Sequence, residues 1–237
     1  MKITTKLISI FILFVCISIS THAQNFLPGF NGFSKKKTSY LHMEGGEIVK
    51  GNLNKLKYEK GLIEEVRIKD LNDKKVKIKP DNIEFMYLPP SGLAKLVNFS
   101  DFITDADQWN NDDLDQSLFK SGYAYFEKSE VRVKKKTNTL MVQLVNPSFC
   151  EKIKVFQDPY AKETASIGVG PLKAGGIAKS YYVKKGNEVA IRLKKKNYEE
   201  EFKMFFGDCP ALIEKYGAKP KWSEFAKHIY EYTKECK

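Results

Sequence analysis

Histidine is scarce in this sequence: only three are present, and just His42 and His228 lie beyond the first 23 residues. Gly-x-Ser-x-Gly turns, His-Glu-x-x-His motifs and Cys-x-x-Cys pairs are absent altogether. These absences exclude the usual patterns of serine hydrolases, zinc proteases, zinc ribbons and thioredoxin-like redox proteins. We expect both histidines to have structural or surface roles. The sequence supports no catalytic, cofactor-binding or metal-binding assignment.

Long apolar segments are also rare, and the main one lies near the N-terminus. The run Leu7–Ile19 covers thirteen residues, whereas roughly 20 are needed to span a bilayer. It follows a short segment that carries Lys2 and Lys6, and it is followed closely by Ala23. This arrangement is typical of a secretory signal peptide, which we predict is cleaved before Gln24. The protein is therefore expected to be exported, either to the periplasm or to the medium.

Two other interpretations of this N-terminal segment remain open. A lipoprotein would use Cys16 as its lipid anchor, but Phe14 and Val15 occupy positions where small residues should precede the cysteine. A retained membrane anchor is the second interpretation, because its apolar segment differs from that of a cleaved signal only in degree. After processing, we expect no integral membrane segment.

Arginine is in short supply as well, and this affects how the basic charge is interpreted. Lys and Arg together number 40 against 29 acids, but only Arg67, Arg132 and Arg192 are arginines. Removal of the signal would lower the formal net charge from +11 to about +9. A basic protein favours anionic partners such as acidic glycans or lipids, although lysines also serve as plain solvated surface. The scarcity of arginine argues against specific nucleic-acid recognition.

Cysteine is limited to Cys150, Cys209 and Cys236 after the signal. Cys150 follows an apolar strand, so we expect a buried and inert thiol. Cys209 and Cys236 flank two short predicted helices, whose far ends would mismatch by roughly 7 Å. A disulfide between them would contribute roughly 3 kcal/mol of stability, and the sequence leaves this pairing open.

The sequence does contain clear alternation with the period of a β-strand. Between residues 38 and 90, apolar and polar positions alternate in five short runs, separated by turn residues such as Gly45-Gly46. This pattern predicts a meander or a small barrel-like unit. Residues 24–37 precede it and contain Pro28, glycine and a lysine triplet, so we expect a flexible N-terminal tail.

An acidic connector, residues 91–121, separates this unit from a second strand-rich part. Asp105 and Asp107 have the spacing of calcium ligands, but the glycine and glutamate of a calcium loop are missing. We therefore expect a solvated connector and no bound cofactor.

Residues 122–206 are expected to form a second antiparallel sheet. Leu140–Val145 has the apolar character of a central strand, and Phe202–Phe206 is interpreted as the last strand. A glycine-rich stretch, residues 168–180, lacks the glycine spacing of a phosphate loop and is followed by strand-forming residues. We interpret it as a flexible loop.

Two lysine runs in this part are interpreted as the tips of β-hairpins. Such side chains attract anionic ligands through electrostatic forces that salt screens. The candidates for contact with an anionic ligand are Lys134, Lys135, Lys136, Lys194, Lys195 and Lys196.

The C-terminal residues 207–237 are expected to form a pair of helices. Pro210 and Gly217 mark the ends of the first, and Phe225 and Ile229 lie four residues apart on the apolar face of the second. The predicted fold class is mainly β, of the α+β type. It consists of an antiparallel meander or small barrel, a second antiparallel sheet and a short C-terminal helical pair.

Short motifs give the chain two resemblances. Val49-x-Gly51-x-Leu53 followed by alternating strands resembles the SH3-like and Sm-like small barrels over residues 40–88. The Arg-Gly loop of Sm-like RNA readers is missing, so RNA binding does not carry over. The chain also resembles uncharacterised exported proteins of the Bacteroidota type, which implies location more than activity. The motifs that carry this second resemblance are Ala23-Gln24, Tyr125-Phe126-Glu127-Lys128, Asp158-Pro159-Tyr160 and Phe206-Gly207-Asp208-Cys209.

These features predict an exported, non-enzymatic protein of the cell envelope that binds a ligand or partner. The expected partner is an envelope protein, or an anionic glycan or lipid such as lipopolysaccharide held by the lysines. A carboxylate-dependent hydrolase is the remaining alternative, because acidic residues are abundant and their spatial separation is not encoded in a motif.

Overall fold

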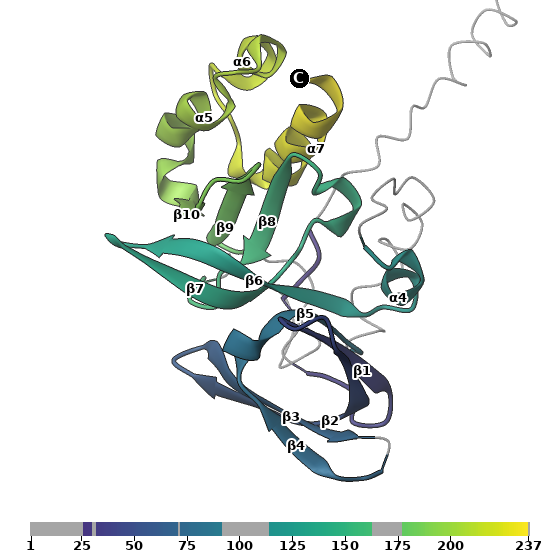
Figure 1. Cartoon of the computed structure of the whole chain (residues 1–237). Helices are drawn as coiled ribbons and strands as arrows, with labels where there is room; N and C mark the ends of the chain where they lie inside the picture. The colour runs from purple at the N-terminus through teal and green to yellow at the C-terminus, as the bar shows by residue number, and fades with distance from the viewer. Residues whose placement is uncertain (1–25, 30–31, 71, 92–113, 163–176, 237) are drawn as a thin grey trace, which may run out of the picture.

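A mixed β-sheet of ten strands forms the frame of the described chain (Figure 1). The structure, a computed structural model, describes residues 26–29, 32–70, 72–91, 114–162 and 177–236. The strand order is β4-β3-β2-β1-β5-β6-β10-β9-β8, and β7 pairs with β6. The strands are β1 Thr38–Met43, β2 Ile48–Glu59, β3 Leu62–Asp70, β4 Lys75–Ile78, β5 Ile83–Leu88, β6 Ala124–Val133, β7 Lys136–Gln143, β8 Ile153–Gln157, β9 Ser180–Lys185 and β10 Ala190–Lys194.

The first five strands form an antiparallel meander, as their alternation predicts. β1 pairs with β2 and β5, β2 pairs with β3, and β3 pairs with β4. Leu41, Val66 and Met86 are fully buried in the core that this meander encloses. Gly46 and Gly61 make the tight turns of two hairpins with positive φ angles of 82° and 83°, which glycine adopts without a steric penalty.

Strand β6 joins the two halves of the sheet. β7 pairs along one edge of β6. The other edge of β6 is shared: β5 pairs with Ala124–Glu127, and β10 pairs with Val131–Arg132. The β6–β10 pair is parallel, whereas the other strand pairs are antiparallel. The predicted mainly β fold with C-terminal helices is confirmed. Of the two predicted forms for the first unit, the meander is the one observed, and it belongs with the second strand-rich part to one continuous, mixed and open sheet.

The segment after β10 is helical, and the prediction of a last strand at Phe202–Phe206 is wrong. A short 3-10 helix, η4 Lys195–Asn197, leads directly into α5 Tyr198–Phe206. Tyr198, Phe202 and Phe206 recur every four residues and are buried on one face of α5. That spacing is helical, and an acidic first turn favours a helix N-terminus. The prediction that the second lysine run forms a hairpin tip is therefore wrong as well.

Two further helices complete a layer against β8, β9 and β10 (Figure 1). They are α6 Pro210–Tyr216 and α7 Phe225–Glu235, with a 3-10 turn, η5 Trp222–Glu224, before α7. A disulfide joins Cys209 to Cys236, with 5.4 Å between their Cα atoms. The predicted length mismatch does not prevent the bond, because α6, η5 and α7 form a bent chain and not two parallel rods. Cys150 is buried and is not part of this disulfide, and its thiol donates to the carbonyl of Pro147 at 3.5 Å.

The N-terminal segment packs on the core at Phe26 and Leu27, within the range 24–37 where the sequence predicts a flexible tail, whereas Lys35–Lys37 are exposed. Leu27 is 3% exposed and its backbone N–H donates to the carbonyl of Val145 at 2.7 Å. The Phe26 ring lies 4.9 Å from that of Tyr181 and 5.3 Å from that of Phe225, measured between centroids. Burial of these two large side chains outweighs the loosening effect of nearby glycine and proline.

Shortening a side chain in this docked segment should destabilise the protein. We expect Leu27→Ala to lower the free energy of unfolding by about 2 kcal/mol, the lower end of the range for buried leucine. Urea unfolding followed by circular dichroism measures this, and Met204→Ala, a change at a residue that is 73% exposed, serves as the control. An unchanged midpoint for Leu27→Ala would show that the segment does not contribute to stability.

A short helix, α4 Gln116–Lys120, ends the region that the sequence assigns to the acidic connector. The Asp115 carboxylate caps it by accepting from the backbone N–H groups of Ser117 and Leu118, and Phe119 is buried beneath it. The signal segment, the Asp105 and Asp107 pair and most of the glycine-rich stretch lie outside the described residues.

Candidate functional site

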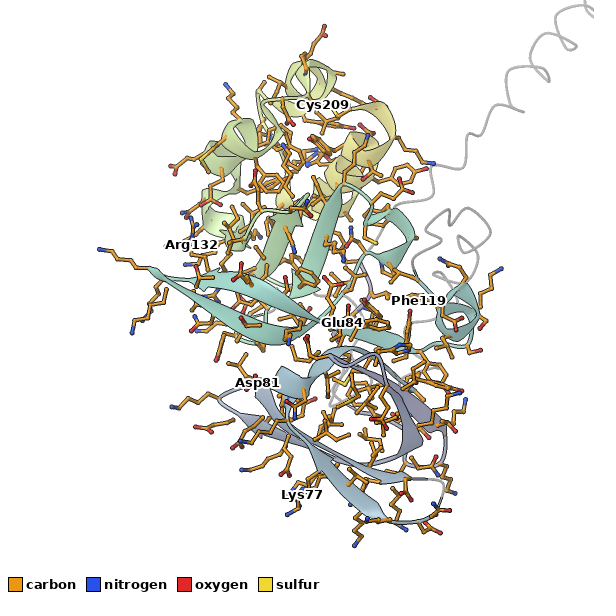
Figure 2. All side chains as sticks on the ribbon, in the orientation of Figure 1. Lys77, Asp81, Glu84, Phe119, Arg132 and Cys209 are labelled. Atoms are coloured by element: carbon orange, nitrogen blue, oxygen red, sulfur yellow. A yellow bond between two sulfur atoms is a disulfide. The ribbon has the colours of Figure 1, made fainter. Side chains whose placement is uncertain are left out.

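Two lysine runs that are 60 residues apart in the chain lie at the same end of the sheet. Ala190 of β10 lies opposite Val131 of β6, and Ile191 lies opposite Arg132, in a parallel register. Both strands therefore point the same way. β6 ends in the turn to β7, where Lys134 takes a φ of 59°, and β10 ends at Lys194. Arg132 is labelled on this side of the molecule in Figure 2.

The next segments along this end of the sheet also carry lysines. The backbone N–H of Lys195 donates to the carbonyl of Lys179 at 2.9 Å, and the N–H of Lys179 donates to the carbonyl of Lys162 at 2.8 Å. Three chain segments, at Lys195, Lys179 and Lys162, thus lie side by side, spaced by roughly 4.8 Å as in any sheet. The β6–β7 turn follows the part of β6 that pairs with β10, at the same end of the sheet. We call their lysines the lysine row: Lys134, Lys135, Lys136, Lys162, Lys179, Lys194, Lys195 and Lys196.

The lysine row is an open cationic surface. Its members are exposed except Lys194, which is half-buried, and within the described residues none of them forms an ion pair. Among the described residues, the acidic first turn of α5 lies nearby, and its Glu201 interacts electrostatically with Lys194. This acidic turn therefore offsets part of the positive charge in the middle of the row.

A buried carboxylate fixes the segments that carry the lysine row. Asp158 follows β8 and is fully buried. Its Oδ2 accepts from Arg192 Nε of β10 at 2.6 Å and from Ser180 Oγ of β9 at 2.5 Å. Its Oδ1 accepts from the backbone N–H of Tyr160 at 2.9 Å. Asp158 thereby ties the ends of three strands together, and ionic hydrogen bonds of this kind are among the strongest in proteins.

Sequence reasoning found part of this site and missed the rest. It selected Lys134–Lys136 and Lys194–Lys196, which the structure places at one end of the sheet. It missed Lys162 and Lys179, because only the strand pairing brings them there. The role of Asp158 was also missed, although an isolated acid next to a strand, together with a rare arginine, is a signal for a buried ion pair.

A concave region lies apart from the lysine row, between the start of β3 and the second half of β7. It has a volume of about 360 Å³ and is lined by both apolar and charged side chains, among them Ile63, Met141 and Glu64. Its charges are largely engaged within the protein, since Lys57 pairs with Glu64 at 2.6 Å and Lys128 donates to the carbonyl of Asp81 at 2.9 Å. This groove offers no set of convergent polar groups for a ligand.

Both histidines contact aromatic side chains. His42 stacks on Phe85 with 4.0 Å between ring centroids, and the Nδ1 atom of buried His228 lies 2.6 Å from the Tyr198 hydroxyl oxygen. The described residues hold no group of three or more His, Cys, Asp or Glu side chains placed to bind a metal ion. Within the same ranges, no helix is both long and apolar enough to cross a membrane.

Burial makes His228 a source of pH-dependent stability. Desolvation lowers the pKa of His228 to about 4, opposed by Glu231 and assisted by Lys227 and Lys215. The ordinary pKa of histidine is 6.5, so between these two values the unfolded chain binds a proton that the folded chain excludes. This contribution to stability is complete above pH 6.5 and is lost as the pH falls toward 4.

We expect His228 to account for a loss of roughly 2 kcal/mol in the free energy of unfolding between pH 7 and pH 4.5. Urea unfolding of the wild type and of His228→Gln at both pH values measures this loss. Both proteins share the remaining titratable groups, so the difference between their losses in the free energy of unfolding gives the contribution of His228. Parallel pH profiles for the two proteins would contradict the expectation.

Comparison with known proteins finds no relative. No protein-family model matches the chain, and no significant match to it exists among the curated proteins or the solved structures. The functional interpretation therefore rests on the architecture itself: a mixed sheet with one lysine-rich end and a disulfide-linked helical layer.

Proposed function

We propose that this protein is an exported, non-enzymatic binding protein that holds an anionic polymer of the cell envelope on the lysine row. The observation that carries the proposal is the parallel pairing of β6 with β10. It gathers lysine runs from distant parts of the chain into a single surface.

The chemistry of the row favours a polymer with repeated negative charges. Lysine acts as a flexible point charge, and it does not impose the planar, bidentate geometry by which arginine selects individual carboxylates or phosphates. The three hydrogen-bonded lysine segments, at Lys162, Lys179 and Lys195, span roughly 10 Å at the spacing of strands. A ligand that uses all of them must carry several anionic groups along its length.

Two features support export. The N-terminal segment has the pattern of a secretory signal, and Cys209 and Cys236 form a disulfide. Disulfides persist in oxidising compartments such as the periplasm and the extracellular medium. The envelope is where an exported protein meets acidic polysaccharides and lipopolysaccharide.

The test uses the mature chain, from Gln24 to the C-terminus, and measures its binding to immobilised acidic polysaccharide and to lipopolysaccharide by biolayer interferometry. We expect saturable binding that weakens by at least about tenfold between 50 and 200 mM salt, because several ion contacts are screened together. Salt-independent binding, or no binding to either material, would overturn the proposal. Recovery of a protein partner instead, after crosslinking in intact cells, would favour an interaction module.

A further inference from the structure

An exposed tyrosine lies at the Lys162 end of the lysine row. Tyr160 is 43% exposed, although its backbone N–H is held by the buried Asp158 carboxylate at 2.9 Å. Its ring approaches the β2–β3 turn: a Cβ atom placed on Gly61 would lie 3.7 Å from Tyr160 Cε1 and 3.4 Å from Pro159 Cβ. The turn and the Asp158 bond thus hold Tyr160 in place, two residues before Lys162 in the chain.

A fixed, exposed aromatic ring beside cations has a specific use in recognition. Its apolar face accepts a flat or weakly polar ring from the ligand, while its hydroxyl stays in water. The neighbouring lysines neutralise the charge that the same ligand carries. Inorganic polyphosphate and lipid headgroups supply charge without such a ring. Acidic polysaccharides and nucleic acids supply both the charge and the ring.

The composition of this surface favours sugars over nucleobases. Proteins that bind single-stranded nucleic acid combine several stacking aromatic residues with arginine. The described chain exposes two tyrosines, Tyr160 and Tyr58, the latter on β2 three residues before Gly61. Arg132 is exposed at this end of the sheet, whereas Arg192 is engaged by Asp158. A surface with one exposed arginine among eight lysines suits a polymer in which sugar rings carry repeated acidic groups.

We infer that the ligand is an acidic polysaccharide, with one sugar ring stacked on Tyr160 and the following acidic groups along the lysine row toward the β6–β7 turn. This inference rests on the proposed function and narrows its ligand class. It assigns to Tyr160 a role in specificity that charge alone does not provide.

The experiment compares Tyr160→Ala, Tyr160→Phe and the wild type in binding three soluble ligands: a polyuronate oligosaccharide, inorganic polyphosphate and a single-stranded oligonucleotide. We expect Tyr160→Ala to weaken polyuronate binding about tenfold, since aromatic stacking contributes on the order of 1–3 kcal/mol. Tyr160→Phe retains the ring and should bind within about twofold of the wild type. Polyphosphate binding should be the same for all three proteins.

The matched control is Met204→Ala, which removes an exposed apolar side chain from α5, and urea unfolding confirms that each variant is folded. An equal loss for polyuronate and polyphosphate, or no loss for either, would overturn the role of Tyr160. A greater loss for the oligonucleotide than for polyuronate would overturn the choice of sugar. If the wild type binds none of the three ligands, the proposed function itself fails, which separates the two results.

Discussion

Reversing the charge of the β6–β7 turn should weaken binding to acidic polymers by about 100-fold or more. The change is Lys134→Glu, Lys135→Glu and Lys136→Glu in one protein. Each lysine near an anionic surface contributes about 1 kcal/mol, and each glutamate adds repulsion. The measurement is the dissociation constant for the polyuronate oligosaccharide at 50 mM salt, with the salt dependence recorded for both proteins. The steepness of that dependence should fall as well, because fewer ion contacts form.

A matched control separates local charge from total charge. Lys74→Glu, Lys75→Glu and Lys77→Glu change the net charge by the same amount at the β3–β4 hairpin. These positions are exposed, and Lys77 lies far from Arg132 in Figure 2. The control protein should bind within about fivefold of the wild type, because separations beyond a Debye length of roughly 10 Å are largely screened. Equal losses in the two triple variants would mean that net charge, and not the lysine row, determines binding.

Removal of the disulfide should produce the largest change in stability. The double variant Cys209→Ser, Cys236→Ser opens a loop whose ends are 27 residues apart in sequence. The chain-entropy estimate gives a loss of roughly 3–4 kcal/mol in the free energy of unfolding. Urea unfolding at pH 7 measures it, and wild-type protein treated with a reductant should shift to the same midpoint.

The control for this pair is Cys150→Ala, which removes a buried thiol without opening a loop and should cost about 1 kcal/mol.

Other contacts still hold the helices after the disulfide is lost. Lys185 of β9 donates to Asp208 at 2.7 Å, and the Tyr232 hydroxyl of α7 donates to the same carboxylate at 2.6 Å. We therefore expect a folded but less stable double variant. A variant as stable as the wild type would show that these contacts suffice.

Local patterns predicted the elements in which burial on one face dominates. The meander of β1 to β5 was foreseen because its inward residues, such as Leu41 and Val66, alternate with polar ones. Residues 198–206 were misread because Phe202–Phe206 contains three phenylalanines, which have high strand propensity. Only the spacing from Tyr198 to Phe202 and Phe206 reveals the helix.

Features that depend on long-range strand pairing could not be predicted from the sequence. The parallel register of β6 with β10 joins residues that are 59 apart in the chain, and nothing in either strand specifies the other. The docking of Phe26 and Leu27 depends on a pocket made by β9 and α7 as well as on their own apolar character. The binding surface could therefore be anticipated as two lysine runs, but not as one row.

Under the proposed export, the docked N-terminal segment would also constrain the order of events during biogenesis. With cleavage before Gln24, only Gln24 and Asn25 separate the new N-terminus from Phe26, whose ring packs among those of Phe149, Tyr181 and Phe225. A peptidase that grips an extended chain on both sides of the cut would need these residues free of the core. If the proposed export and cleavage hold, processing precedes final folding, and the helical layer closes over Phe26 only after the cut.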